Sequence, residues 1–219
     1  MLSKLKSLFT GKSKKPDVGA LQLDKLVYLG FDYRNHYRAI LKREPTPKQI
    51  AELFLFRGWT VQYGYSMLCK EKAAADEIIF QCVMMYQTFG QLFINKLNNM
   101  NIESELCDDM VSLIDKRWQD YDVVAFQSRE EMKKAWQSIL AQIDIESDFE
   151  SVPIAIKMFE HSANGAAYVS GVIRHLCDAH LAITDQNVIA NLSEDFLNQL
   201  KTITQLAMAN GLGNNNPKH

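Results

Sequence analysis

Apolar residues recur along this chain with a helical period almost throughout, and signals for β-strands are nearly absent. No internal repeat is apparent in the sequence. The pattern predicts an all-α fold, a single compact multi-helix domain of about seven or eight helices with a short N-terminal amphipathic helix. The predicted helices cover residues 2–10, 20–43 with a break at Gly30, 47–70, 73–99, 102–120, 128–144, 152–183 and 185–209.

Several of these helices begin at recognisable capping sequences. Thr46 to Gln49 combines a capping box with proline at the first helical position, and Ser128 to Glu131 and Ser147 to Glu150 are further boxes. Asn101 can cap the helix that follows it, because its side-chain oxygen can accept a backbone N–H bond. Gly211 is placed to end the last helix.

The helix predicted over residues 73–99 is the expected centre of the fold, because residues 78–95 carry no charge. An uncharged stretch of about 18 residues reaches the lower limit for a membrane span. Polar side chains on the opposite face argue against a span, since amides in hydrocarbon cost several kcal/mol. We therefore predict a core helix. These polar residues are Glu77, Gln81, Thr88, Gln91 and Asn95.

A narrow stripe of small residues runs along the helix predicted over residues 152–183. Ala163, Ala167, Ser170 and Gly171 form this stripe. Small side chains let another backbone approach closely, so we expect a tight helix crossing there. A ligand passing beside Gly171 is the functional alternative.

The first fifteen residues form a basic amphipathic segment without an acidic residue. The whole chain holds 24 basic and 26 acidic residues, so 24 − 5 = 19 basic residues remain outside this segment. We predict that it docks on an anionic membrane surface or a partner protein. A terminus that only rests on its own domain is the alternative. The expected docking residues are Leu2, Leu5, Leu8 and Phe9 on the apolar side, with Lys4, Lys6, Lys12, Lys14 and Lys15.

These features divide the chain into residues 1–19, a basic segment and linker, residues 20–210, an all-helical domain, and a disordered tail over 211–219. The 47% hydrophobic content can form a core without disulfides. The scattered cysteines indicate reduced thiols of a cytosolic protein and no cofactor or metal. They are Cys69, Cys82, Cys107 and Cys177.

Charge and targeting signals narrow the expected location and partners. The net charge of −2 argues against a dedicated nucleic-acid binder. Lysines interrupt every stretch that can serve as the apolar region of a secretory signal. We therefore predict a cytoplasmic protein, which on the membrane-docking hypothesis is peripheral at the inner face of a membrane. The sequence does not indicate the oligomeric state.

Histidines supply the best candidates for chemistry. In α-helical geometry His175 and His180 lie about 140° apart, so a regular helix cannot turn both toward one metal ion. His175 and Asp178 can instead form a pair in which the carboxylate orients the imidazole. Arg174 competes for that carboxylate at a spacing of four residues. A structural or surface pairing is the alternative to a site.

A second polar cluster has the sequence FDYRNHYR over residues 31–38. His36 lies one turn from Asp32 in this cluster. An aromatic corner of the core is the preferred interpretation of the rings in this cluster. Arginine and tyrosine are also favoured at protein interfaces, so partner contact is the functional alternative and ranks above nucleic-acid binding. The candidate interface residues are Tyr33, Arg34, Tyr37 and Arg38.

These observations predict a non-enzymatic helical binding or regulatory module. The chain contains no glycine-rich nucleotide loop, nucleophile elbow or Glu-x-x-His pair. One alternative is a small-ligand-binding protein or an enzyme with a polar site between the 152–183 and 31–38 segments, where His175, Asp178 and His36 are the candidate catalytic residues. Another is a toxin-neutralising or chaperone-like partner of a specific protein.

Overall fold

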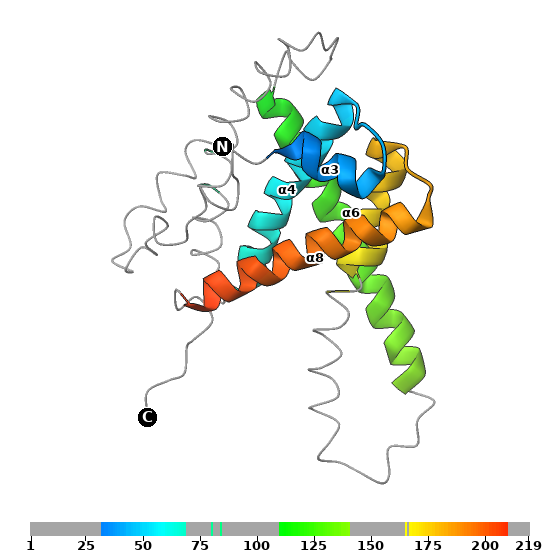
Figure 1. Ribbon diagram of the computed structural model, residues 1–219. Coiled ribbons are helices and arrows are strands. Elements are labelled where there is room, and N and C mark those ends of the chain that lie inside the picture. Colours follow the sequence, from blue (N-terminus) through cyan, green and yellow to red (C-terminus); the bar gives the residue numbers. More distant parts are fainter. Residues whose placement is uncertain are drawn as a thin grey trace, which may run out of the picture. The chain divides into compact units, whose positions relative to one another are not determined.

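The computed structural model describes residues 32–68, 110–140 and 167–209, together with residues 80, 84 and 165. Within this part 90% of the residues are helical and no strand occurs, which confirms the all-α prediction. Among the described helices, none has the length and apolar character that a membrane crossing requires. Figure 1 shows the described helices in their order along the chain.

The chain divides into two compact units. The unit that carries the candidate site comprises residues 33–56 and 115–197. The other unit comprises residues 1–32, 57–114 and 198–219. The helices α4, α6 and α8, whose bounds follow below, each contribute residues to both units.

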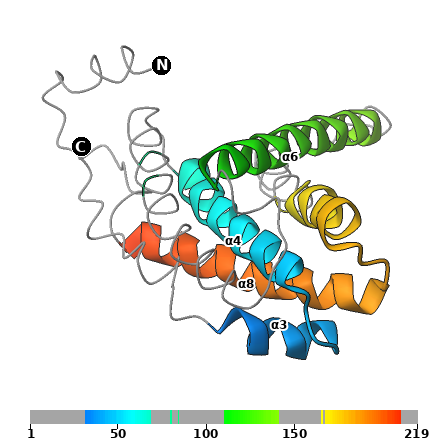
Figure 2. The same cartoon turned by 90° about the horizontal axis from the view of Figure 1, so that it is seen from above.

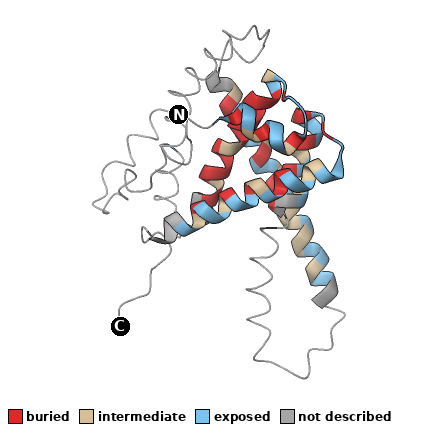
Figure 3. Ribbon diagram, viewed as in Figure 1, coloured by how far each residue is buried: buried red, intermediate tan, exposed pale blue. Residues whose placement is uncertain are grey.

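Helix α4, Pro47–Leu68, begins at the predicted capping box. The backbone N–H of Gln49 donates to Thr46 Oγ1 at 3.2 Å, and the backbone N–H of Thr46 donates to Gln49 Oε1 at 3.1 Å. Residues 50–56 are all buried, so this stretch has no solvent-facing side (Figure 3). A helix surrounded in this way occupies the middle of a core.

Helix α3, Tyr33–Leu41, lies alongside the first half of helix α8, Gln186–Ala209 (Figure 2). Asp185 caps α8, because its Oδ1 accepts a bond of 2.8 Å from the backbone N–H of Asn187. The prediction of a helix over residues 185–209 is therefore confirmed to within a residue.

Helix α6, Met110–Leu140, is continuous, so the prediction that a new helix begins at Ser128 is wrong. Residues 121–127 contain no glycine or proline that would end the preceding helix. The side chain of Ser128 is used in packing: a Cβ built on Gly171 would lie 2.7 Å from its Cβ, too close for any real contact. The tight helix crossing predicted at Gly171 is confirmed.

Two segments expected to be α-helical are wound as π-helices. They are η4, Ala167–Ile173, and η5, Leu176–Leu181. In a π-helix the hydrogen bonds run from residue i to i+5, so residues five apart lie nearer to one face than in an α-helix. The buried residues here form three pairs with this spacing, which are Tyr168 with Ile173, Val172 with Cys177, and Leu176 with Leu181. The same buried residues also form four pairs four residues apart, among them Tyr168 with Val172 and Cys177 with Leu181, so their spacing alone does not select this winding.

An aromatic cluster fills the core of the unit formed by residues 33–56 and 115–197. The ring of Phe56 meets Tyr121 and Phe196 edge-on, with centroids 5.0 and 4.5 Å apart, and stacks on Tyr168 at 6.2 Å. Such pairs add to the free energy of burial. Buried members of the same cluster are Tyr33, Tyr37 and Phe54.

In the other unit, the second half of α4 packs against the end of α8. Gln199 Nε2 donates to the backbone carbonyl of Arg57 at 3.2 Å. A Cβ on Gly64 would lie 2.9 Å from a methyl group of Ile203, so the glycine permits this close approach. Trp59 also stacks on Tyr63, with centroids 4.6 Å apart.

Several predictions lie outside the described residues. They include the basic segment 1–15, the caps at Asn101 and Ser147, the helix end at Gly211 and the small residue Ala163. Of the helix predicted over residues 73–99, the structure describes two residues, Phe80 and Met84. All of these stay predictions.

Candidate functional site

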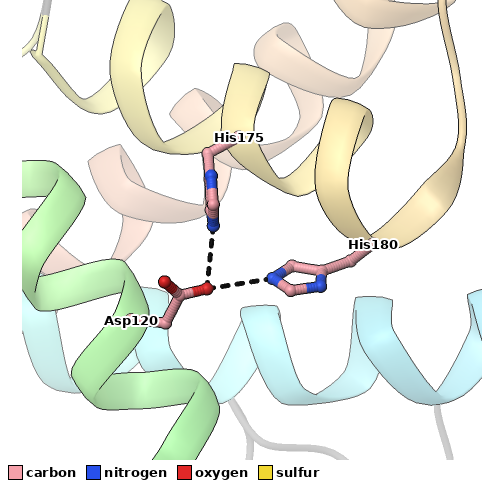
Figure 4. Close-up of side chains that lie close together, drawn as sticks. All are labelled: Asp120, His175 and His180. Atoms are coloured by element: carbon pink, nitrogen blue, oxygen red, sulfur yellow. Dashed lines mark hydrogen bonds and ion pairs between the residues drawn. The ribbon is translucent and has the colours of Figure 1, made fainter.

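One carboxylate oxygen accepts hydrogen bonds from two histidines in this structure (Figure 4). His175 Nε2 lies 2.8 Å from Asp120 Oδ2, and His180 Nε2 lies 3.1 Å from the same oxygen. Asp120 comes from the middle of α6, whereas His175 precedes η5 and His180 lies within it. An ionised carboxylate only accepts, so both imidazoles present an Nε2–H to it.

The π-helical winding of η5 explains how the two histidines meet. They are five residues apart, the spacing that a π-helix brings onto one face. Their ring centroids are 5.2 Å apart and the rings are nearly perpendicular. The expected separation of about 140° was wrong because it assumed α-helical geometry.

Exposure increases across the cluster from the core toward solvent. The side chain of His180 is 10% exposed, that of His175 29% and that of Asp120 38%. Burial lowers the pKa of His180, with Arg117 and His175 acting in the same direction, although Glu52 and Asp120 oppose the shift. His180 is therefore a neutral imidazole at neutral pH.

The carboxylate of Asp120 is held in its charged form. Burial acts to raise its pKa, but the hydrogen bonds and charges of His175 and His180 outweigh burial and lower the pKa below its ordinary value. The cluster thus combines an anionic oxygen with two imidazole nitrogens, and it remains open to solvent on the side of the carboxylate.

A buried ion pair holds the elements behind the cluster in place. Glu52 of α4 is fully buried, and its two carboxylate oxygens accept bonds of 2.8 and 2.7 Å from Nε and Nη2 of Arg117. The hydrogen bond to Glu52 raises the pKa of Arg117. Arg117 lies one helical turn before Asp120, so the pair fixes the part of α6 that presents the carboxylate.

Aromatic residues of α6 complete the support. Trp118 Nε1 donates to the backbone carbonyl of Leu55 at 3.1 Å. The ring of Tyr121 lies edge-on to both imidazoles, with centroids 5.7 Å from His180 and 6.4 Å from His175. These contacts restrict the orientations of the two rings.

Cys177 lies between the two histidines in sequence but does not join them. It is a free, fully buried thiol, and burial raises its pKa to about 12. It is therefore protonated at neutral pH and is not available as a thiolate ligand. The other three cysteines lie outside the described residues.

The predicted pair of His175 with Asp178 is wrong. Asp178 is exposed and its carboxylate lies 3.8 Å from Nε of Arg174, the competitor at a spacing of four residues. His175 bonds instead to Asp120 of α6. Of the proposed catalytic residues, only His175 belongs to the cluster.

His36 pairs with a carboxylate of its own. Its Nε2 lies 2.9 Å from Oδ1 of Asp195 in α8. The structure therefore does not join His36, His175 and Asp178 in one hydrogen-bonded group.

The aromatic members of the 31–38 segment belong to the core. Tyr33 and Tyr37 are 3% and 0% exposed, in agreement with the preferred interpretation of an aromatic corner. Arg34 and Arg38 are exposed, and both form ion pairs with Glu44. The interface prediction therefore reduces to the two arginines, for which it stays a prediction.

Sequence reasoning missed Asp120 and did not group His180 with His175. No local pattern around Asp120 marks it, since its partners lie 55 and 60 residues away. The buried residues of this segment gave no signal for the histidine pair, because Tyr168, Val172 and Leu176 also follow the spacing of an α-helix. A helical wheel drawn for a π-helix brings the two histidines closer to one face than one drawn for an α-helix.

The ligand atoms of Asp120, His175 and His180 all lie within 4.8 Å of one another, a grouping that can hold a metal ion. Two imidazole nitrogens and one carboxylate oxygen form a ligand set of zinc and of non-haem iron(II). Comparisons with protein-family models, with curated proteins and with solved structures found no significant match to this chain.

Proposed function

We propose that this protein binds a divalent transition-metal ion through Asp120, His175 and His180. The observation that supports the proposal is the convergence of three ligand atoms from two separate elements to within 4.8 Å. Magnesium and calcium prefer oxygen ligands alone, so two imidazoles favour zinc, iron(II) or a similar ion.

The spacing within the cluster suits a shared ion. The two nitrogen-to-oxygen distances are 2.8 and 3.1 Å. Ligand atoms on one ion with bonds of about 2.1 Å lie about 3.0–3.4 Å apart, so these two distances need only small changes. The two imidazole nitrogens, which lie within 4.8 Å of each other, would adjust to the same range. The ion would take the place of the two protons that now lie between nitrogen and oxygen. Binding therefore releases protons or moves them to Nδ1, and affinity falls at acid pH.

The protonation states of the side chains also favour a cation. His180 is neutral because burial lowers its pKa, and Asp120 is ionised because the histidines lower its pKa. A neutral imidazole and a carboxylate are the forms that bind metal. A bound ion would supply Lewis-acid chemistry at a position that solvent can reach beside Asp120.

Isothermal titration calorimetry of the untagged full chain with Zn²⁺ tests the proposal. Asp120→Asn and His175→Asn should each weaken binding by more than about 100-fold, since even indirect changes around metal sites cost 10–100-fold. His36→Asn is the matched control, because it removes a histidine that also bonds to an aspartate but lies outside the cluster.

The results decide between a metal site and a structural hydrogen-bonded cluster. Binding that is lost in both cluster variants and kept in His36→Asn supports the metal site. Equal binding by the wild type and Asp120→Asn would overturn the proposal. Co²⁺ added in place of Zn²⁺ should give a visible absorption spectrum that depends on Asp120.

We also propose that residues 1–15 dock on an anionic membrane surface or a partner protein, and the five lysines without an acidic residue support this. Binding to vesicles that contain phosphatidylserine should weaken with salt and disappear when residues 1–15 are deleted. Binding that ignores salt, or none at all, would contradict membrane docking.

We further propose that residues 20–210 form one folding domain of about seven or eight helices, as their helical pattern suggests. One cooperative unfolding transition, coincident for different probes, would support a single domain. Two separate transitions would contradict it.

A further inference from the structure

We infer that metal binding and the π-helical winding of residues 176–181 are coupled: the ion binds the π-helical form, and the bound ion holds that winding in place. The inference rests on the proposed metal site and adds how this site is regulated. It makes the winding of η5, Leu176–Leu181, depend on metal occupancy.

The geometry of the two histidines carries this inference. In α-helical winding His175 and His180 would lie about 140° apart around the helix axis, and one of them would turn away from Asp120. In the observed winding both Nε2 atoms reach the same oxygen. A ligand that binds one of two forms better shifts the equilibrium toward that form, so the ion favours the π-helix.

The end of η5 shows which contacts depend on the winding. The backbone N–H of Ile183 donates to the carbonyl of Cys177 at 2.9 Å, across Ala182, whose φ of 52° is left-handed. Gln49 Nε2 donates to the carbonyl of Leu181 at 2.6 Å. A change to α-helical winding would move the carbonyl of Leu181 and disturb these bonds.

Gln49 extends the coupling to the start of α4. The same side chain that bonds to Leu181 also completes the capping box, because its Oε1 accepts from the backbone N–H of Thr46. Its Oε1 further accepts a bond of 3.1 Å from Arg43. The residues that follow α3 and begin α4 are therefore bonded to the end of η5, and we expect metal occupancy to affect their stability.

Hydrogen exchange of the full chain tests the coupling. For amides that exchange only after the segment opens and releases the ion, Zn²⁺ at 100 times its Kd should slow exchange by about 100-fold. We expect this slowing for residues 176–183. A smaller slowing is expected at Gln49. Amides in the second half of α8, residues 198–205, should not change, and Asp120→Asn should show no effect of Zn²⁺.

The outcomes separate the coupling from the proposed function. Slowing confined to residues 176–183 and the start of α4 supports the coupling. If calorimetry shows Zn²⁺ binding but exchange is unchanged, or slows equally throughout the described helices, the coupling is wrong and the metal site stands. If no Zn²⁺ binds, the proposed function itself fails.

A shift of one histidine tests the winding directly. The double variant Ala179→His, His180→Ala moves the second imidazole from a spacing of five residues to four, the spacing that an α-helix aligns. Ala179 is exposed, so the substitution adds no bulk to the core.

We expect the shifted variant to bind Zn²⁺ about 100-fold more weakly than the wild type, as His180→Ala alone should. Far-UV circular dichroism verifies that both variants fold. Binding as tight as that of the wild type would show that the segment binds metal in α-helical winding, which overturns the coupling and leaves the metal site intact.

Discussion

Replacement of Arg117 by methionine should lower the free energy of unfolding by about 3–5 kcal/mol, the cost of breaking a buried ion pair from one side. Glu52 has no exposed side-chain surface, and both of its oxygens bond to Arg117, at 2.7 and 2.8 Å. Hydrogen bonds to charged groups contribute about 1.5–3 kcal/mol each, so two of them give about 3–6 kcal/mol, which overlaps this range. The variant leaves a carboxylate buried without this partner.

A double variant shows which of two causes destabilises Arg117→Met: the unpaired charge of Glu52 left in the core, or the lost attraction between the two side chains. With Glu52→Leu added to Arg117→Met, neither charge of this pair remains, and apolar side chains of similar volume fill the space. Such replacements of buried ion pairs are often neutral or stabilising. We therefore expect the double variant to be more stable than Arg117→Met alone, and close to the wild type.

Equilibrium unfolding in urea measures these changes. The transition is followed by far-UV circular dichroism and tryptophan fluorescence, and a chelator removes any contribution from bound metal. Lys133→Met is the matched control, because it breaks the exposed pair with Glu130 and should leave the unfolding midpoint unchanged. Glu52→Leu is also measured alone. If the double variant loses as much stability as the sum of the losses of Arg117→Met and Glu52→Leu, the two residues act independently and the buried ion pair does not explain the cost.

Three further results are expected. Gly171→Ala should lower the free energy of unfolding in urea by about 1–3 kcal/mol, because the new Cβ overlaps the side chain of Ser128. The loss should be smaller when Ser128 is also replaced by glycine, and an equal loss in both backgrounds would contradict the close contact. Ala182→Gly should stabilise by up to about 1 kcal/mol, since φ is 52° there, and a loss of stability would argue against the left-handed conformation. The pKa of His180 is lowered by burial, so without metal the unfolded chain takes up its proton first and stability falls as pH drops below about 6.5. His180→Gln should weaken that fall in urea titrations at several pH values, and an unchanged fall would exclude His180 as its source.

Much of the fold followed from local sequence. Thr46 to Gln49 form the capping box that the sequence predicted, because both partners lie within one turn and need no tertiary contact. The start of α8 at Asp185 has the same kind of cause. Gly171 signalled a close helix approach because only a missing Cβ permits one. The all-α class followed from periodicity alone.

Only the tertiary structure decided the candidate site. Asp120 meets its histidines across 55 and 60 residues, a contact that depends on how α6 packs and leaves no trace in the local pattern. The π-helical winding of η4 and η5 was not predicted, because the buried residues of this segment also fit an α-helix. Ser128, a helix start by its sequence, became a packing residue inside α6. Hydrogen bonds within one helical turn are determined by residues close in sequence. The meeting of Asp120 with the two histidines is determined by how α6 packs against residues far away in the chain.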